Sequence, residues 1–175
     1  MPDPVDADRR RFLEAAAVAL ASAPFTVASA ADAGEGGSSP ASANAIQNSF
    51  SSIEQIDAGD LNVGYVLAGP ATGKPVILLH GWPYDIHSYV DVAPLLAAKG
   101  YRVIVPYLRG FGSTRFVSDS AMRNGQPSAL ASDVVALMDA LKIKHAILGG
   151  FDWGARTANI VATLWPERCT GMVSV

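Results

Sequence analysis

From residue 50 onwards, short apolar runs alternate along the chain with longer amphipathic segments. Residues 53–56 and 61–67 predict two strands, which a turn at Gly59-Asp60 would join into an antiparallel hairpin at a sheet edge. Short apolar runs, typical of strands buried on both faces, occupy residues 76–79, 103–105 and 146–148. A final run at 172–175 predicts the start of another strand.

Three segments between these runs carry apolar residues at helical spacing. The first helix has its apolar face at Tyr89, Val92, Leu95 and Leu96. The second has the stripe Leu130, Val134, Leu137 and Leu141. The third buries Ala158, Val161, Ala162 and Trp165. Gly100 would end the first helix and Pro166 the third. Strands that alternate with such helices predict an α/β fold, a mostly parallel sheet with helices on both faces.

The composition is that of a folded domain, because half of the 175 residues are hydrophobic and 17% are charged. The net charge is −3 and no basic block occurs outside the N-terminal region, so nothing indicates a nucleic acid or acidic partner. Cys169 is the only cysteine, which excludes an internal disulfide and a cysteine-based metal site. We interpret it as a buried structural thiol.

The first thirty residues differ in character from the rest. Arg9-Arg10-Arg11-Phe12-Leu13 precedes a small apolar run at 15–23, and Ala28-Ser29-Ala30 offers a cleavage site. The pattern resembles a twin-arginine export signal, which predicts a removable signal peptide at 1–30 and a bacterial periplasmic or secreted protein. A short amphipathic surface helix is the alternative, and the run is too short for a stable membrane span. Residues 31–49, rich in Ala, Gly, Ser and Pro, predict a flexible linker before a folded domain at 50–175.

Residues 150–154, Gly-Phe-Asp-Trp-Gly, stand between an expected buried strand and an expected helix. This order is typical of a nucleophile elbow, with Asp152 where an esterase would carry serine. The turn is so tight that side chains at Gly150 and Gly154 would collide, and the nucleophile itself takes a strained backbone conformation. An ordinary strand-to-helix turn with Asp152 facing solvent is the alternative.

Two further motifs follow expected strands: His80-Gly81-Trp82-Pro83 after the third and Leu108-Arg109-Gly110-Phe111-Gly112 after the fourth. Together with Gly150–Thr157 (GFDWGART), they resemble the α/β-hydrolase fold family, in its aspartate-nucleophile branch of epoxide hydrolases and haloalkane dehalogenases. The resemblance runs from about residue 51 to residue 175 and covers the N-terminal half of that fold. It implies a sheet truncated after about the sixth strand, with the cap domain and the C-terminal half absent.

The resemblance implies that Asp152 is the nucleophile, which attacks a small apolar epoxide or alkyl halide and forms a covalent ester. A carboxylate is ionised at neutral pH, so this attack needs no base. Hydrolysis of the ester needs a histidine base and backbone N–H groups for the oxyanion, which the resemblance assigns to Trp82 and Trp153. No cofactor or metal is implied, because the covalent ester takes the role a metal would otherwise have.

Residues around the two motifs bear on the subfamily. Trp82 favours an epoxide hydrolase, because dehalogenases usually carry asparagine at that place, whereas Trp153 fits both subfamilies. Phe151 stands where this branch usually has histidine. Both tryptophans could alternatively be core aromatics. Haloalkane dehalogenase therefore remains the second hypothesis within the family.

None of the three histidines is placed to act as the base. His80 belongs to the expected oxyanion loop and would hold backbone conformation, and His87 opens the following helix in an exposed position. His145 precedes the elbow strand, roughly 20 Å from its other end. The chain alone is therefore predicted to be inactive, and a catalytically incomplete fragment or binding remnant is a competing hypothesis.

Charged residues nearby are expected to have structural or solvent-facing roles. Arg109 would tie loops together by hydrogen bonds rather than bind substrate. Asp133 and Asp139 stand among the polar positions of the second helix and predict a solvated face.

Overall fold

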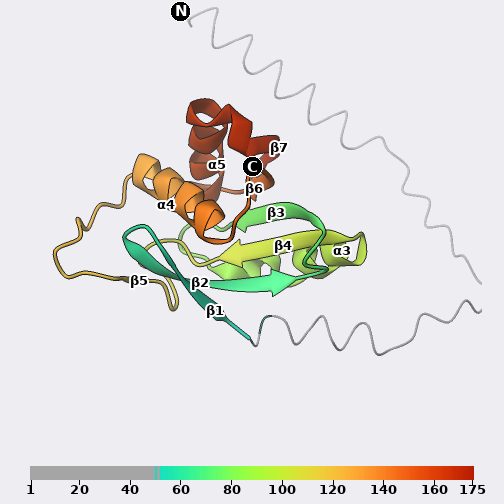
Figure 1. The fold of residues 1–175 in the computed structure, drawn as a ribbon, viewed down its shortest axis with the longest axis horizontal. Helices are drawn as coiled ribbons and strands as arrows, with labels where there is room; N and C mark the ends of the chain where they lie inside the picture. Colours follow the sequence, from blue (N-terminus) through green and yellow to red (C-terminus); the bar gives the residue numbers. More distant parts are fainter. Residues whose placement is uncertain (1–49, 51) are drawn as a thin grey trace, which may run out of the picture. The chain divides into compact units, whose positions relative to one another are not determined.

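The computed structural model describes residue 50 and residues 52–175. The predicted signal peptide (1–30) and linker (31–49) lie outside the described residues. The strands are β1 (Glu54–Ala58), β2 (Leu61–Ala68), β3 (Lys74–Leu79), β4 (Tyr101–Pro106), β5 (Arg115–Phe116), β6 (Ala146–Gly150) and β7 (Cys169–Ser174). The helices are α3 (Val92–Ala98), α4 (Pro127–Ala140) and α5 (Trp153–Leu164), with 3-10 turns η2 (Ile86–Tyr89) and η3 (Pro166–Arg168) (Figure 1).

The strands of the described residues form one sheet in the order β1-β2-β4-β3-β6-β7, with β5 beside β2. β1 and β2 form the predicted antiparallel hairpin, and β2 continues antiparallel to β4. The remaining strands β4, β3, β6 and β7 run parallel to one another. In this register Leu79 at the end of β3 lies beside Gly150 at the end of β6. The loops that follow these two strands therefore leave the sheet at the same edge.

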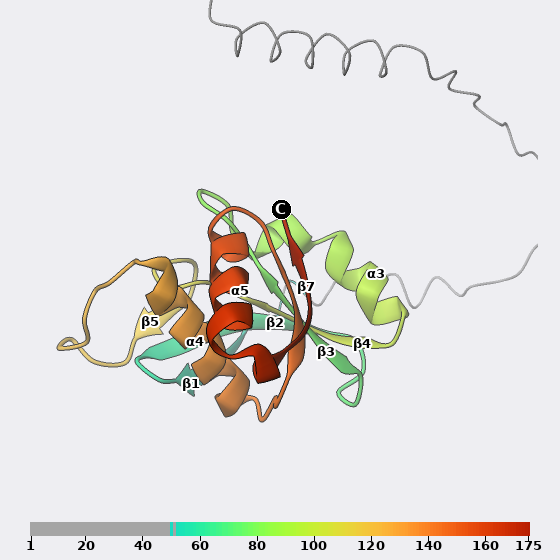
Figure 2. The same ribbon diagram turned by 90° about the horizontal axis from the view of Figure 1, so that it is seen from above.

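Successive side chains of the strands point to opposite faces and form two cores. Ile77 and Leu79 of β3 belong to one cluster, against α4 and α5, and Val76 and Leu78 belong to the other, against η2 and α3. Figure 2 shows α4 and α5 together on one face and α3 set apart from them. The predicted α/β fold with helices on both faces is confirmed.

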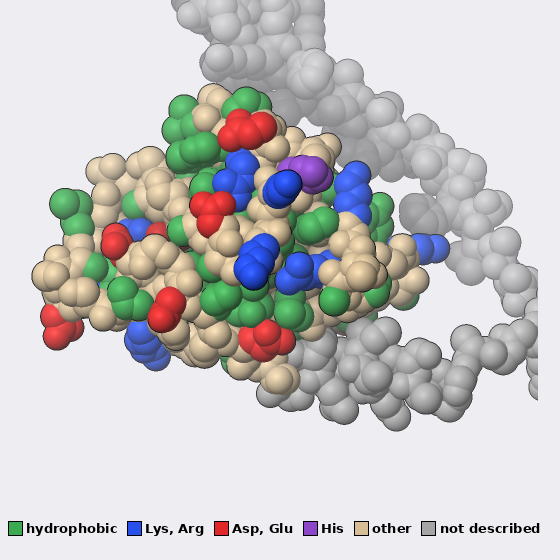
Figure 3. Space-filling model, viewed as in Figure 1, with side chains coloured by type: hydrophobic (Ala, Val, Ile, Leu, Met, Phe, Trp, Pro, Cys, Tyr) green, Lys and Arg blue, Asp and Glu red, His purple; other side chains and the backbone are tan. Residues whose placement is uncertain are grey.

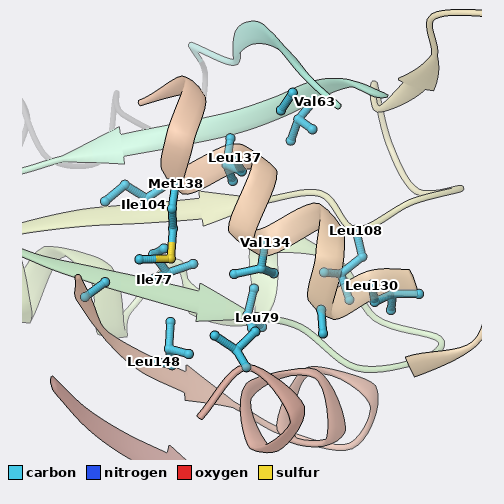
Figure 4. Packing of buried hydrophobic residues seen from close by; sticks show 14 of the residues in the cluster. Val63, Ile77, Leu79, Ile104, Leu108, Leu130, Val134, Leu137, Met138 and Leu148 are labelled. Carbon is cyan, nitrogen blue, oxygen red and sulfur yellow. The ribbon is translucent and has the colours of Figure 1, made fainter. Parts of the chain in front are cut away.

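Helix α4 packs closely against the sheet through the stripe that its sequence predicts. Leu130, Val134, Leu137 and Met138 are buried and point toward strand residues that include Ile104 (Figure 4). Pro127 occupies the first turn of this helix, where proline's missing N–H costs no hydrogen bond. Leu141, also expected in the stripe, follows the last helical residue and is half-buried.

The expected helix through Tyr89 and Leu96 is divided into two elements. Tyr89 ends η2, and α3 begins three residues later at Val92. Val92 and Leu95 are exposed, so the expected apolar face of this helix is not the face that packs on the core. Within α3 the side that packs on the core is formed by Ala93, Leu96 and Ala97, so small residues replace Val92 and Leu95 at the contact. The two-residue strand β5 was also not predicted, because it is too short to show alternation.

The sheet ends at β7 with exposed apolar side chains. Met172 and Val173 of β7, Leu164 of α5 and Val175 are all exposed, and no further strand pairs with β7 among the described residues. On the face drawn in Figure 3, one group of hydrophobic side chains surrounds an acidic side chain at the top, and others are scattered among the basic and acidic groups below. Cys169 packs against the core but is only half-buried, so the expectation of a buried thiol holds in part.

No helix among the described residues is long and apolar enough to cross a membrane.

Candidate active site

The turn between β6 and α5 is the strained element that its glycines predict. Asp152 has φ 49° and ψ −115°, a backbone conformation that residues with a side chain rarely adopt. A Cβ on Gly150 would lie 2.4 Å from the carbonyl carbon of Gly154, and one on Gly154 would lie 2.0 Å from the carbonyl oxygen of Leu79. Both glycines are therefore required by sterics, and the turn holds Asp152 beyond the end of the sheet.

The loop after β3 lies directly against this turn. A Cβ on Gly81 would stand 2.8 Å from Cβ of Asp152 and 2.8 Å from the Phe151 ring. Because Gly81 has no side chain, the next backbone N–H, that of Trp82, approaches the carboxylate and donates to Asp152 Oδ2 at 2.9 Å. The Trp82–Pro83 peptide bond is cis. The structure thus brings together Asp152 and the Trp82 amide, which the sequence places 70 residues apart.

Backbone N–H groups keep the Asp152 carboxyl ionised. The peptide N–H of Trp82, followed by that of Trp153, lowers the pKa of Asp152 below its usual value, and Arg156 acts in the same direction. Both amides stabilise the charged form because a hydrogen bond to a carboxylate is stronger than one to a neutral acid. The exposed carboxylate is therefore anionic and oriented at neutral pH.

The two tryptophans differ in burial. The Trp82 side chain is 66% exposed, so it is not a core residue of the part of the chain that the structure describes. Trp153 is half-buried, packs against the core on the α4 side, and has the Arg156 guanidinium 5.5 Å from its ring centroid. Both side chains line an open cavity of about 410 Å³. The other lining residues are Gly81, Leu108, Arg109, Phe111, Gly125 and Leu130.

His80 is completely buried and holds two loops together, as expected for a residue that maintains backbone conformation. Its Nδ1 lies 3.0 Å from the carbonyl oxygen of Gly81, and its Nε2 accepts a hydrogen bond from the N–H of Leu108 at 3.2 Å. The Phe111 ring packs edge-on against the imidazole, with centroids 4.8 Å apart. Burial lowers the pKa of His80, so the imidazole is neutral.

The other histidines are not at the site. His87 is exposed and pairs with Asp85 at 3.0 Å, and His145 is exposed at the start of β6, opposite the end that leads to Asp152. Among the described residues, no histidine or second carboxylate contributes to the environment that sets the pKa of Asp152. The described part of the chain therefore places backbone N–H groups, and no histidine, around the carboxylate of Asp152.

Arg109 has the loop-tying role expected for it. Its Nε and a terminal nitrogen each donate to the Asp133 carboxylate at 2.6 Å, and its guanidinium also donates to the carbonyl oxygens of Asn124 and Ala129. The prediction that Asp133 is solvated is wrong, because Arg109 folds back from the loop after β4 and covers it. Asp139 is exposed, as predicted, and pairs with Arg168.

Tyr89 is a site-supporting residue that sequence reasoning missed. Its hydroxyl donates to the carbonyl oxygen of Leu79 at 2.9 Å, at the point where β3 gives way to the Gly81 loop, and burial raises its pKa to about 12. The rings of Tyr89 and Tyr84 pack against Phe151, with centroids 6.0 and 5.8 Å away. The sequence contains one signal for this role of Tyr89, the aromatic Phe151 at a place where histidine was expected, because an aromatic ring there can pack against another.

Among the described residues, no three His, Cys, Asp or Glu side chains come together in an arrangement that could hold a metal ion.

The family model for the alpha/beta hydrolase fold matches residues 74–175, more than half of the chain. The chain belongs to the α/β-hydrolase fold family. The resemblance inferred from the HGWP, LRGFG and GFDWGART motifs is thereby confirmed at the level of family and fold.

Relatives of this chain within the family include proteins named as epoxide hydrolases and proteins named as dehalogenases. The chain is 38% identical over 104 residues to epoxide hydrolase B of Mycobacterium tuberculosis, covering 59% of this chain and 28% of that protein. It is 37% identical over 113 residues to fluoroacetate dehalogenase of a Burkholderia species, covering 64% of this chain and 36% of that protein. The chain thus spans about a third of the length of the curated relatives it matches.

Solved structures agree with the fold. A protein of Klebsiella pneumoniae assigned to the epoxide hydrolases matches with a TM-score of 0.72 and 69% identity, over 73% of this chain and 42% of that one. Epoxide hydrolase A of Mycobacterium thermoresistibile matches with a TM-score of 0.65 and 28% identity, over 70% of this chain and 38% of that one.

Proposed function

We propose that this chain carries the nucleophile and oxyanion-binding part of an epoxide hydrolase, with Asp152 as the nucleophile. The observation that carries the proposal is the hydrogen bond from Trp82 N–H to Asp152 Oδ2. The strained backbone of Asp152 supports it, because such strain clusters at functional sites. The names of the M. tuberculosis and K. pneumoniae relatives support the substrate class.

We assign different roles to the two carboxylate oxygens of Asp152. Oδ1 attacks an epoxide carbon, the carbon–oxygen bond of the ring breaks, and the released alkoxide takes a proton from solvent. Oδ2 remains as the carbonyl oxygen of the resulting ester. It already accepts the Trp82 N–H, so it stands where negative charge develops when the ester is later attacked. Trp153 N–H is the second proposed donor, since it also stabilises the charged Asp152 carboxyl.

The cavity that Trp82 and Trp153 line fits a small apolar substrate. Trp82, Trp153 and Phe111 line it together with two leucines, so its walls offer mainly apolar contact area. Arg109 also lines it, but its guanidinium is engaged with Asp133. We therefore expect a substrate whose reactive carbon approaches Asp152 while an apolar substituent lies against the aromatic rings.

A base for hydrolysis of the ester is not present beside Asp152 among the described residues. We therefore propose that the 175-residue chain, acting alone, is alkylated once and stalls. Incubation with styrene oxide and intact-protein mass spectrometry test this, and we expect one lasting adduct that maps to Asp152. Rapid release of diol without an adduct would contradict it, and so would an equal adduct on an Asp152→Asn variant.

A haloalkane dehalogenase is the second candidate, and the fluoroacetate dehalogenase relative favours it. The same attack by Asp152 would then displace a halide ion from a saturated carbon. The two candidates are distinguished by parallel incubations with styrene oxide and 1-bromobutane. Faster adduct formation with the bromide, with one bromide ion released per adduct, would favour the dehalogenase. The absence of adducts with both reagents would support a binding remnant.

We also propose export by the twin-arginine route, on the evidence of Arg9, Arg10 and the following Phe12-Leu13. Residues 1–30 fused to a reporter that is active only after folded export would test this in a bacterium. Replacement of both arginines by lysine is expected to abolish export, because the pathway reads the arginine pair. Unchanged export in the double variant would contradict the proposal.

A further inference from the structure

One peptide group connects His80 to Asp152. Nδ1 of His80 lies 3.0 Å from the carbonyl oxygen of Gly81. That carbonyl and the N–H of Trp82 belong to the same planar peptide unit, so a force on one end turns the other. The N–H end donates to Oδ2 of Asp152 at 2.9 Å. A continuous path of hydrogen bonds therefore runs from the buried imidazole, through a single amide, to the carboxylate.

The partners of the imidazole determine which nitrogen carries its proton. Leu108 N–H donates to Nε2 at 3.2 Å, so Nε2 must have a lone pair and the proton must be on Nδ1. Nδ1–H then donates to the carbonyl oxygen of Gly81, which can only accept. Burial disfavours the charged imidazolium, and the neutral ring satisfies both bonds at once. The Phe111 ring packed against the imidazole restricts its rotation.

We propose that His80 is a positioning residue, whose Nδ1–H orients and polarises the Gly81–Trp82 peptide group so that its N–H points at Asp152. The inference rests on the proposed role of this amide in the reaction. A hydrogen bond accepted at the carbonyl strengthens the N–H of the same amide as a donor, by about 10–30% per bond in condensed phases. The Leu108 bond anchors the other side of the ring, so the loop after β4 helps to aim the loop after β3.

Two substitutions separate the two hydrogen bonds of His80. Asparagine offers an N–H near the place of Nδ1, so His80→Asn can keep the bond to the Gly81 carbonyl and lose the bond from Leu108. Glutamine reaches further with its carbonyl oxygen, so His80→Gln can accept from Leu108 and lose the bond to Gly81. His87→Asn is the matched control, because His87 is exposed and its imidazole pairs with Asp85.

Nuclear magnetic resonance on the full chain tests the coupling without any reaction. We expect the Trp82 amide proton to move upfield, and the pKa of the Asp152 carboxyl to rise, in His80→Gln. Both should stay close to the wild-type values in His80→Asn and in His87→Asn. A residue that merely fills space would affect both His80 variants equally. Equal shifts in the two variants, or none in either, would overturn the proposal, even if styrene oxide forms no adduct with the wild type.

A kinetic test uses hydroxylamine in place of the missing base. Wild type and variants are first loaded with styrene oxide, which leaves a hydroxyalkyl ester on Asp152. Hydroxylamine nitrogen then attacks the ester carbonyl carbon, negative charge forms on Oδ2, and the intermediate expels the diol oxygen, which takes a proton. Asp152 is left as a hydroxamate, and intact mass follows the loss of the adduct.

The expected rates distinguish the inference from the proposed function. Adduct loss should be about tenfold slower in His80→Gln, less than the roughly hundredfold or greater cost of removing a whole oxyanion donor. His80→Asn should recover most of the rate, and His87→Asn should match the wild type. If the wild type forms no adduct, the proposed function fails and the resonance data still decide the role of His80. If all four proteins lose the adduct at one rate, the positioning role is wrong.

Discussion

Gly150 lies so close to Gly154 that a Cβ on the first would stand 2.4 Å from the carbonyl carbon of the second. We therefore predict that Gly150→Ala destabilises the fold by about 3 kcal/mol, since neither backbone can withdraw from the turn. Gly154→Ala should cost as much, because its Cβ would meet the Leu79 carbonyl oxygen at 2.0 Å. Urea denaturation followed by circular dichroism measures both.

Gly171→Ala is the control for these glycines. The nearest atom to a Cβ on Gly171 is 3.7 Å away, on Ile147, which is an ordinary contact. Its free energy of unfolding should change by less than about 1 kcal/mol. A similar loss of stability in all three variants would mean that the backbone freedom of glycine, rather than the steric clash in the tight turn, causes the destabilisation.

The ion pair of Arg109 and Asp133 supplies a second prediction. Their side chains are only 9% and 15% exposed, and burial raises the pKa of Asp133 despite the pairing. Asp133→Asn should therefore cost about 3 kcal/mol of stability, because it leaves a guanidinium in a poorly solvated place. Asp119→Asn, in the exposed pair with Arg123 at 3.7 Å, should cost less than about 0.5 kcal/mol. Equal effects at the two sites, measured by urea denaturation, would contradict this.

His80 should make the stability of the chain depend on pH. Its pKa in the folded state is below 6.5, chiefly because of burial, although the negative charge of Asp85 acts to raise this pKa. The unfolded chain therefore binds a proton that the folded chain does not, as pH falls from 6.5 toward the folded pKa. Stability is fully present above 6.5 and decreases below it.

His80→Asn tests this pH dependence. Denaturation midpoints between about pH 5 and pH 8 should fall less steeply toward acid pH in this variant than in the wild type. The variant can be less stable at every pH, since it loses the bond from Leu108, but its slope must be flatter. Parallel curves for the two proteins would show that other groups cause the acid sensitivity.

The open edge at β7 predicts self-association. Val173 is 61% exposed, and β7 has no charged residue that would discourage a second strand from pairing with it. Val173→Lys should therefore shift the chain from aggregates toward monomer in size-exclusion chromatography with light scattering. Val117→Lys is the matched control, because Val117 is also exposed but lies after β5, away from this edge. Equal improvement in both variants would indicate a general effect of charge.

Most elements could be predicted from local patterns, because a strand or helix with one buried face has apolar residues at a characteristic spacing along the sequence. The α4 stripe of Leu130, Val134 and Leu137 is an example. The face of α3 could not be predicted, since the small residues Ala93 and Ala97 pack on the core where the larger Val92 and Leu95 were expected. Asp133 was misjudged for a different reason, because its partner Arg109 comes from another element.

By itself, the sequence determined where the strained turn lies, because the spacing of Gly150 and Gly154 permits it only there. It likewise determined that an aspartate, Asp152, stands at the tip of this turn. It also determined the family, through short motifs at strand ends. Only the tertiary structure decided that Trp82 N–H meets Asp152 and that His80 holds the other end of that amide. These contacts depend on the parallel pairing of β3 with β6, which brings together loops far apart in the chain. No local pattern encodes such pairing, because it is selected by the packing of the whole sheet.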